Sequence, residues 1–129
     1  MKQSQAWPML TLLLLSLSWT GAALAEATPC RPDATLQLWL QEQAVHWRRQ
    51  LHSYPGIEEP PAVTICRLAQ GVPHSRHGQI WLPPLDQEEL YLSLAHEYLH
   101  LLFRHHPNSR NEAFIEQLAR ALILGEPPP

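Results

Sequence analysis

The sequence predicts a small single-domain protein of the α+β class, with its elements in the order helix, strand, strand, helix, helix. Three segments repeat apolar residues every three to four positions, which is the period of an amphipathic helix. Two short runs rich in β-branched and aromatic residues lie between the first and second of these segments and predict strands. We expect the core to span about residues 33–124, because a chain of 129 residues can bury one modest core.

The first 25 residues have the features of a signal peptide. Lys2 precedes an apolar run over residues 9–19, and residues 23–25 (Ala-Leu-Ala) form the small-x-small pattern of a cleavage site. The apolar run is too short to cross a bilayer, so we expect no membrane span after cleavage. Cleavage after Ala25 leaves 104 of the 129 residues, and we expect residues 26–129 to form one domain that is exported to the periplasm or the medium.

The charge of the mature chain argues against nucleic acid as a partner. Lys2 is the only lysine, so the mature chain carries eight arginines against 12 acidic residues. The arginines form no basic cluster of the kind that binds a phosphate backbone. We therefore expect no nucleic-acid partner.

Cys30 and Cys66 are the only two cysteines. In an exported chain an even pair predicts one disulfide. The bond would close an interval of 36 residues and contribute roughly 3–4 kcal/mol to stability in the chain-entropy model.

The first helix is expected to begin at Pro32-Asp33 and to end near Tyr54, before Pro55-Gly56. The face that packs on the core is predicted from apolar positions three or four residues apart: Leu36, Leu40, Ala44, Trp47 and Leu51.

Two strands are expected next, over residues 62–66 and 79–82. The segment between them contains Gly71, Pro73 and Gly78 and is therefore turn-rich. It could join the two strands as a long hairpin.

Two helices complete the chain. Asp86 and Glu89 form a capping box that opens the first of them, which must end before Pro107. The last helix is expected from about Arg110 to Leu124. Its core-facing stripe is predicted to be Ile115, Leu118, Ala119 and Leu122.

The segment that indicates chemistry is His96-Glu97-Tyr98-Leu99-His100, a His-Glu-x-x-His pattern inside a predicted helix. Two histidines four residues apart lie on one face of a helix, so both imidazoles can reach the same metal ion. Glu97, beside the first histidine, is placed to hold a water molecule and take its proton. The alternative is an ordinary histidine pair on a helix surface.

This pattern resembles that of the zincin metallopeptidases. Asn111-Glu112-Ala113 followed by Glu116 is similar to the gluzincin branch, in which a glutamate on the following helix is the third ligand and an acid four residues later orients the first histidine. The resemblance implies one zinc ion bound by His96, His100 and Glu112, with Glu116 hydrogen-bonded to His96. The chain departs from the family in two ways: Glu116 replaces an aspartate, and the interval from His100 to Glu112 is shorter than in thermolysin-like enzymes.

Two alternatives for the third ligand stay open. If the first of the two helices ends near Phe103, Glu112 falls beside His100; if it continues to His106, Glu116 comes level with the metal and the two glutamates exchange roles. We favour Glu112. His106 has the spacing of a metzincin third ligand, but that pattern needs a glycine where Phe103 stands and a later methionine that the chain lacks.

The resemblance implies a mini-zincin that hydrolyses peptide bonds of a peptide or protein substrate, using water activated by zinc with Glu97 as general base. Zincins place an exposed edge strand beside the motif helix, and we expect residues 79–82 to be that strand. Trp81 is then either a wall of the cleft or, as we favour, a buried core residue. No oxyanion-stabilising residue is identified, although Arg104, His105 and Tyr91 lie nearby in sequence.

Two other functions are compatible with the same residues. One is a non-catalytic zinc-binding protein, and the other is an interaction or accessory protein of the bacterial envelope, with an envelope protein as partner. Residues 96–120 also resemble a group of uncharacterised bacterial secreted proteins, some of which are encoded beside bacterial α2-macroglobulins. That resemblance implies a role in the envelope.

Overall fold

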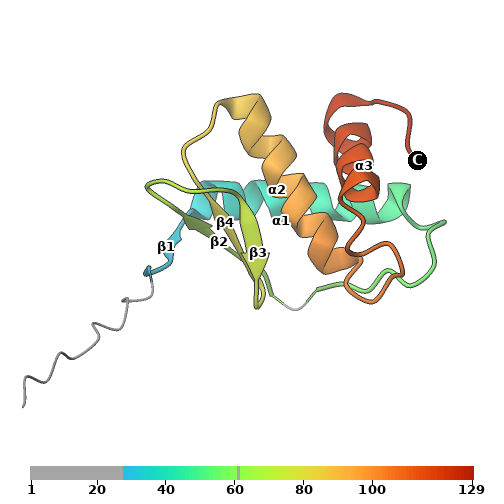
Figure 1. Ribbon diagram of the computed structural model, residues 1–129, viewed down its shortest axis with the longest axis horizontal. Helices are drawn as coiled ribbons and strands as arrows, with labels where there is room; N and C mark the ends of the chain where they lie inside the picture. Colours follow the sequence, from blue (N-terminus) through green and yellow to red (C-terminus); the bar gives the residue numbers. More distant parts are fainter. Residues whose placement is uncertain (1–27, 61) are drawn as a thin grey trace, which may run out of the picture.

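Three helices and a four-stranded sheet make up the part of the chain that the structure describes. The structure is a computed structural model, and it describes residues 28–60 and 62–129 (Figure 1). The predicted signal peptide, residues 1–25, lies outside the described residues. The predicted α+β class is confirmed. In chain order the elements are β1 (Arg31–Pro32), α1 (Ala34–Gln50), β2 (Thr64–Arg67), β3 (His74–Arg76), β4 (Gln79–Leu82), α2 (Gln87–Leu102) and α3 (Glu112–Leu124).

The strands of the sheet lie in the order β1-β2-β4-β3. The expected long hairpin is wrong, because β2 and β4 run parallel, with Ile65 opposite Ile80. The turn-rich segment that follows β2 is long enough to cross to the far edge of the sheet, where it forms β3. The chain then turns back to form β4. Therefore β4 lies between β2 and β3, and it pairs antiparallel with β3.

A two-residue turn joins β3 to β4. Arg76 pairs with Gln79 on either side of it, and the two residues between them, His77 and Gly78, have φ angles of 50° and 75°. Positive φ at both central positions is the geometry of a type I′ hairpin turn. The Gly78 carbonyl also accepts a hydrogen bond from the Thr64 N–H at 3.0 Å, which fixes the turn beside β2.

Helix α1 begins where its cap predicts. The Asp33 carboxylate accepts a hydrogen bond from the Leu36 N–H at 3.0 Å. The predicted core face is buried, but the helix ends at Gln50 rather than near Tyr54, because the chain passes into a turn at Leu51. The Gln37 side chain ties α1 to β2: its amide donates to the Val63 carbonyl and its oxygen accepts from the Ile65 N–H.

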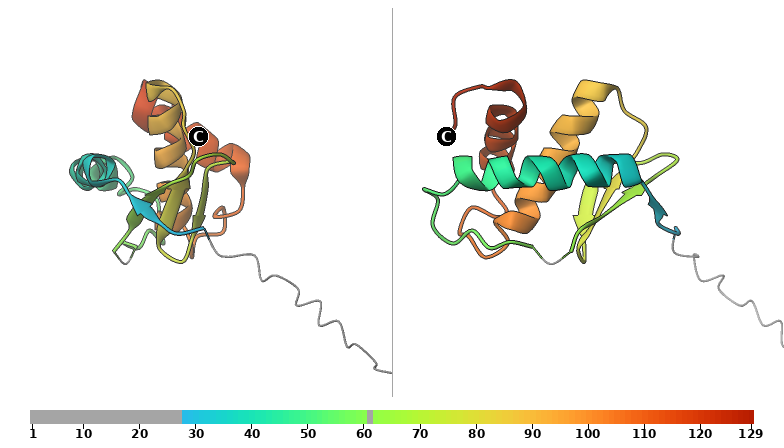
Figure 2. Two further views of the ribbon diagram at one scale, coloured as in Figure 1. Left: turned by 90° about the vertical axis from the view of Figure 1, so that its left-hand side faces the viewer. Right: turned by 180° about the vertical axis from the view of Figure 1, so that it is seen from behind.

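Helix α2 is the central element of the fold. Helix α1 crosses it, as the rear view in Figure 2 shows, and Trp39 stacks on Tyr91 at a ring distance of 4.3 Å. Tyr98 is 4% exposed and contacts Trp47. Sheet and helices share one core, to which β2, β4, α2 and α3 contribute Ile65, Ile80, Leu82, Leu94, Leu99, Leu102, Ile115 and Leu118.

The predicted disulfide is confirmed. Cys30 and Cys66 are bonded, with their Cα atoms 5.0 Å apart. The bond joins the segment before β1 to β2, on the face of the sheet that is opposite Ile65 and Ile80. Within the described residues, no helix combines the length and the apolar character that crossing a membrane requires.

Candidate metal centre

Helix α2 brings the two motif histidines together. His96 and His100 lie four residues apart on the same face, and their Nε2 atoms are 3.2 Å apart. Their side chains are 17% and 19% exposed, so the imidazoles are held by packing and still open to the solvent side. The helix ends at Leu102, next to Phe103. This is the shorter of the two helix lengths considered from the sequence, and for this length Glu112 was expected to lie beside His100.

The connection from α2 to α3 is a series of tight turns. The His106 N–H donates to the Phe103 carbonyl at 2.7 Å, and the Asn111 N–H donates to the Asn108 carbonyl at 3.0 Å. Asn111 then caps α3, with its side chain accepting from the Phe114 N–H at 3.1 Å. Glu112 is therefore the first residue of α3, two residues later than the start expected at Arg110.

The Glu112 carboxylate spans the two imidazoles. Its Oε2 lies 2.8 Å from His96 Nε2, and its Oε1 lies 3.0 Å from His100 Nε2. These three side chains form a group whose ligand atoms could hold one metal ion. The structure thus brings together the three residues predicted as ligands, and their assignment to zinc stays a prediction.

The outer nitrogen of each imidazole also has a partner. His96 Nδ1 lies 2.7 Å from a carboxylate oxygen of Glu116, and His100 Nδ1 lies 2.9 Å from the carbonyl oxygen of Ser109. Because a carbonyl oxygen only accepts, the His100 hydrogen must be on Nδ1, which leaves the Nε2 lone pair facing Glu112. A carboxylate on Nδ1 favours the same arrangement for His96.

This donor set fits a zinc ion. Two imidazole nitrogens and a carboxylate lie within reach of one ion, and nitrogen and oxygen donors of this kind are those that zinc binds. Bonds of about 2.0–2.1 Å in a tetrahedral zinc site place the ligand atoms about 3.3 Å apart. The two imidazole nitrogens are 3.2 Å apart, and the two Glu112 oxygens lie 2.8 Å from His96 Nε2 and 3.0 Å from His100 Nε2, so each pair is close to that spacing.

The ionisation of Glu112 agrees with this arrangement. Partial burial opposes ionisation, but the hydrogen bonds and charges of His96 and His100 outweigh it when their Nε2 atoms carry hydrogen, the state in which a proton rather than a metal ion occupies the group. Together they lower the pKa of Glu112 below its ordinary value. The carboxylate is thus held in the anionic form that a metal ion requires.

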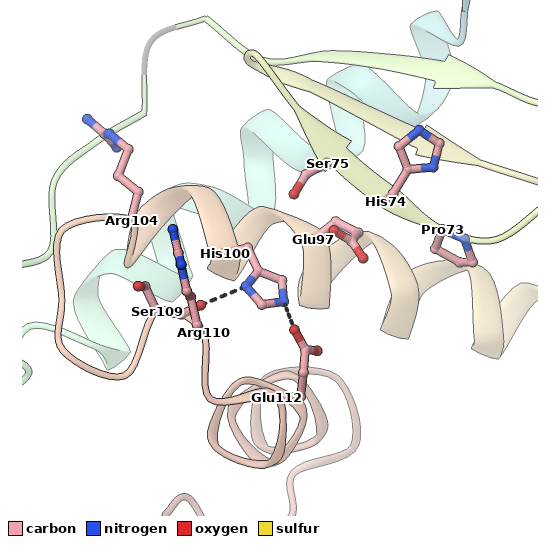
Figure 3. A pocket seen from close by; sticks show the side chains of 9 residues that line it. All are labelled: Pro73, His74, Ser75, Glu97, His100, Arg104, Ser109, Arg110 and Glu112. Carbon is pink, nitrogen blue, oxygen red and sulfur yellow. Dashed lines mark hydrogen bonds and ion pairs between the residues drawn. The ribbon is translucent and has the colours of Figure 1, made fainter.

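Glu97 lies next to this group and is the one charged side chain among the buried residues described, at 9% exposed. It borders two cavities that meet at the metal centre, of about 580 and 350 Å³, here called the larger and the smaller cavity. Figure 3 shows its carboxylate between His100 and strand β3. Both cavities share Pro73, Glu97 and Glu112. The larger adds Ser75, His100, Arg104 and Arg110, and the smaller adds Glu89, Ser93, Glu116 and Arg120.

The edge strand beside the motif helix is β3, and the expectation that residues 79–82 form that edge is wrong. Those residues form β4, which has neighbours on both sides. Trp81 is neither a wall of the cleft nor a buried core residue. It is half-buried on the face of the sheet opposite the core, and its ring lies parallel to that of His74. Sequence reasoning missed β3 because it has only three residues, and the signal for it was the His77-Gly78 turn.

Other nearby residues are placed away from the metal centre. The His106 ring packs against Phe103 and Phe114 instead of pointing at the centre, so the metzincin alternative has no structural support. His105 lies 3.6 Å from Glu58 on the surface. Of Arg104, His105 and Tyr91, only Arg104 borders the larger cavity. Arg110 borders it too, although no sequence pattern indicated this residue.

Fold and site together define a small α+β protein with a disulfide and a His-His-Glu group that could hold a metal ion. Residues 10–108 match the family described as "Predicted secreted protein (DUF2300)", and the chain belongs to this family. The matched region contains His96, Glu97 and His100 and ends before Glu112. The predicted export is confirmed by that family description.

The chain is also similar to a protein of Escherichia coli (strain K12) that bears the name "Uncharacterized protein YfaQ". The two are 35% identical over 101 residues, which cover 72% of this chain and 18% of the relative. The chain therefore spans less than a fifth of that relative's length. No solved structure shows a significant match to this chain.

Proposed function

We propose that this protein is a zinc-dependent peptidase of the zincin type. The observation that carries the proposal is the position of the buried Glu97 carboxylate beside three converging ligand atoms, in a cavity that is bordered by a sheet edge. A metal, a base and a strand edge are the three parts that peptide hydrolysis by this chemistry needs.

His96, His100 and Glu112 would hold the zinc ion. When bound, zinc polarises a carbonyl group and acidifies water. Glu116 fixes the ring of His96, and the Ser109 carbonyl fixes the ring of His100, so both imidazoles keep their Nε2 lone pairs directed at one point. This pre-orientation avoids a rearrangement during binding.

Glu97 would be the general base. Its carboxylate accepts a proton from the attacking water as the water oxygen bonds to the peptide carbonyl carbon, and it then delivers that proton to the leaving amine as the C–N bond breaks. Its position suits this role, because its side chain borders both cavities that meet at the ligand atoms.

Strand β3 would hold the substrate. It pairs with β4 on one side, and it is the last strand in the order of the sheet. An extended peptide can add to such an edge through backbone hydrogen bonds, which recognise a main chain whatever its side chains. Ser75 on this strand borders the larger cavity, so a peptide added there passes the metal centre.

The cavities are open, and their walls come from β3, α2, α3 and the connection between the two helices. An envelope protein that closes the outer side of this cleft is the partner that we propose besides the peptide or protein substrate. Such a partner would exclude water from the reacting bond.

A second candidate function is a zinc site that stabilises the fold without catalysis. It is favoured by the position of the ligands, since His96 and His100 lie on α2 and Glu112 on α3, so that one ion would join the two helices. A structural zinc ion contributes directly to folding. The two functions differ in what they require of Glu97.

The test is the metal content and the peptidase activity of the exported protein, measured in parallel. Wild type, Glu97→Gln and the exposed control His46→Ala are expected to carry about one zinc ion per chain, and His96→Ala little. Glu97→Gln is expected to lose roughly 10²–10⁴-fold in peptide cleavage. Zinc binding with no difference between wild type and Glu97→Gln on a peptide library would favour the structural role. A wild type that takes up no zinc would exclude both.

A further inference from the structure

The cleft beside the metal centre differs in charge at its two ends. The larger cavity contains Arg104 and Arg110, whereas the smaller cavity contains Glu89 and Glu116. Arg120, which also borders the smaller cavity, is paired with Glu126 at 2.7 Å. A substrate in this cleft therefore meets cationic side chains at one end and anionic side chains at the other.

Arg104 is already engaged within the protein. Its guanidinium donates to the carbonyl oxygens of Leu101 at 2.9 Å, Glu58 at 3.2 Å and Glu59 at 3.4 Å. It also lies 3.4 Å from the Glu58 carboxylate. These contacts hold the segment that follows α1 against the end of α2, so the role of Arg104 is structural.

The guanidinium of Arg110 is available. The arginine ion pairs within residues 28–60 and 62–129 use Arg48, Arg67, Arg104 and Arg120. Arg110 makes none there, and in Figure 3 its side chain extends alongside His100 on the cavity side. Its backbone is held in place, because the preceding carbonyl, of Ser109, bonds His100, and the following residue, Asn111, caps α3.

We propose that Arg110 binds a carboxylate of the substrate, which makes the enzyme selective for acidic peptides. This inference rests on the proposed function. A guanidinium can donate two parallel hydrogen bonds to a carboxylate, and such pairs are the strong ones among protein hydrogen bonds. Arg110 stands two residues before Glu112, so its position relative to the metal centre is fixed by the same turn.

The direction of β3 indicates which part of the substrate carries the charge. Pro73 borders both cavities, whereas Ser75 borders only the larger one, so β3 runs toward the end where Arg110 lies. A peptide that adds antiparallel to β3, the more stable pairing, then has its N-terminal half at Arg110. The carboxylate is therefore an acidic side chain on the N-terminal side of the bond that is cleaved.

Hydroxamate peptides test this directly, because a hydroxamate chelates zinc and fixes where the peptide lies. Acetyl-Ala-Glu-hydroxamate and acetyl-Ala-Gln-hydroxamate extend toward the N-terminal half of the site. A second pair, Ala-Ala capped by a hydroxamate at its N-terminus and ending in a free acid or an amide, extends the other way and presents a terminal carboxylate. Dissociation constants are measured by calorimetry on zinc-loaded wild type, Arg110→Gln, Arg110→Lys and the exposed control Arg49→Gln, with zinc content recorded for each.

We expect the Glu compound to bind wild type roughly tenfold more tightly than the Gln compound. Arg110→Gln should remove this preference while keeping its zinc, Arg110→Lys should keep part of it, and Arg49→Gln should leave it unchanged. A preference for the free acid in the second pair, also lost in Arg110→Gln, would support the carboxylate site and assign it to a peptide C-terminus. Equal binding of acid and amide in both pairs, with zinc present, overturns the role of Arg110 alone. If no hydroxamate binds and no zinc is found, the peptidase proposal fails, and the carboxylate site fails with it.

Discussion

His96 Nδ1 lies 2.7 Å from a carboxylate oxygen of Glu116, one helical turn beyond Glu112, whose own carboxylate lies 2.8 Å from His96 Nε2. One imidazole is thus held on both sides by α3. Each contact depends on where α2 ends, because a longer α2 would shift α3 along it. The two glutamates therefore have different positions about the same ring, although they lie on the same helix face.

Replacement of Glu116 by Gln is expected to weaken zinc binding roughly tenfold or more, because an amide orients the His96 ring less firmly than a carboxylate. Stability should change little, since the side chain is 47% exposed. The measurement is the zinc dissociation constant from competition with a chelator. Gln117→Ala, an exposed neighbour on α3, is the control. Equal affinity in the wild type and the Glu116→Gln protein would show that the contact does not position the ligand.

Removal of zinc is expected to lower the free energy of unfolding, because the ligands come from two different helices. At a free zinc concentration of about 100 times the dissociation constant, the difference should be about 2.7 kcal/mol. Urea unfolding with added zinc and with EDTA measures it. In His96→Ala the two curves should coincide. A wild type whose unfolding midpoint is the same in both solutions would contradict a metal that bridges α2 and α3.

Loss of the disulfide is expected to destabilise the fold without removing the metal centre. The double variant Cys30→Ala/Cys66→Ala should lose roughly 3–4 kcal/mol in the free energy of unfolding, because the unfolded chain gains the freedom of the opened loop. Its zinc content should match wild type, since neither cysteine borders the two cavities at the centre. Denaturant unfolding under non-reducing conditions is the measurement. A difference below about 1 kcal/mol would indicate that the bond adds little to the fold.

Alkaline pH is expected to destabilise the protein through Tyr98. Burial raises the pKa of Tyr98 above its usual value of 10.0, while nearby Arg48 lowers it and Glu59 raises it by smaller amounts. Because the folded pKa is the higher one, the contribution of Tyr98 to stability is complete below pH 10.0 and is lost as the pH rises through the folded pKa.

Comparison of wild type with Tyr98→Phe checks this expectation. The free energy of unfolding, measured in urea between about pH 9 and about pH 11, should fall less steeply in the variant, which has no phenol to ionise. The same slope in both proteins would mean that other groups cause the alkaline loss. Tyr91→Phe, at a half-buried tyrosine, provides the comparison for a lost hydroxyl.

Much of the fold could be predicted from local patterns. The 3.6-residue period and the capping residues Asp33 and Asp86 located α1 and α2, because both signals act within one or two helical turns. The approach of Glu112 to His100 was also predictable, since it depends only on where one helix ends and the next begins. The disulfide followed from an even number of cysteines in an exported chain.

The remainder depended on contacts between distant residues. Whether β2 pairs with β4 in a parallel or antiparallel sense is decided by the path of the segment between them, which carries no periodic signal. The outward position of Trp81 follows from that same pairing, with Cys66 as its neighbour. Arg110 could not be recognised either, because a guanidinium that lacks a partner in the described structure leaves no pattern in the sequence.

The turn that follows Phe103 has a consequence for folding. All the residues assigned to the metal centre and its support lie within residues 96–116, a hairpin of two helices joined by hydrogen-bonded turns. Closing so short an interval costs little chain entropy, whereas β1 must pair with β2 across the longer interval from Arg31 to Arg67. A newly exported chain can therefore assemble its ligands early, and zinc captured by this hairpin would give α1 and β1 a formed surface on which to fold.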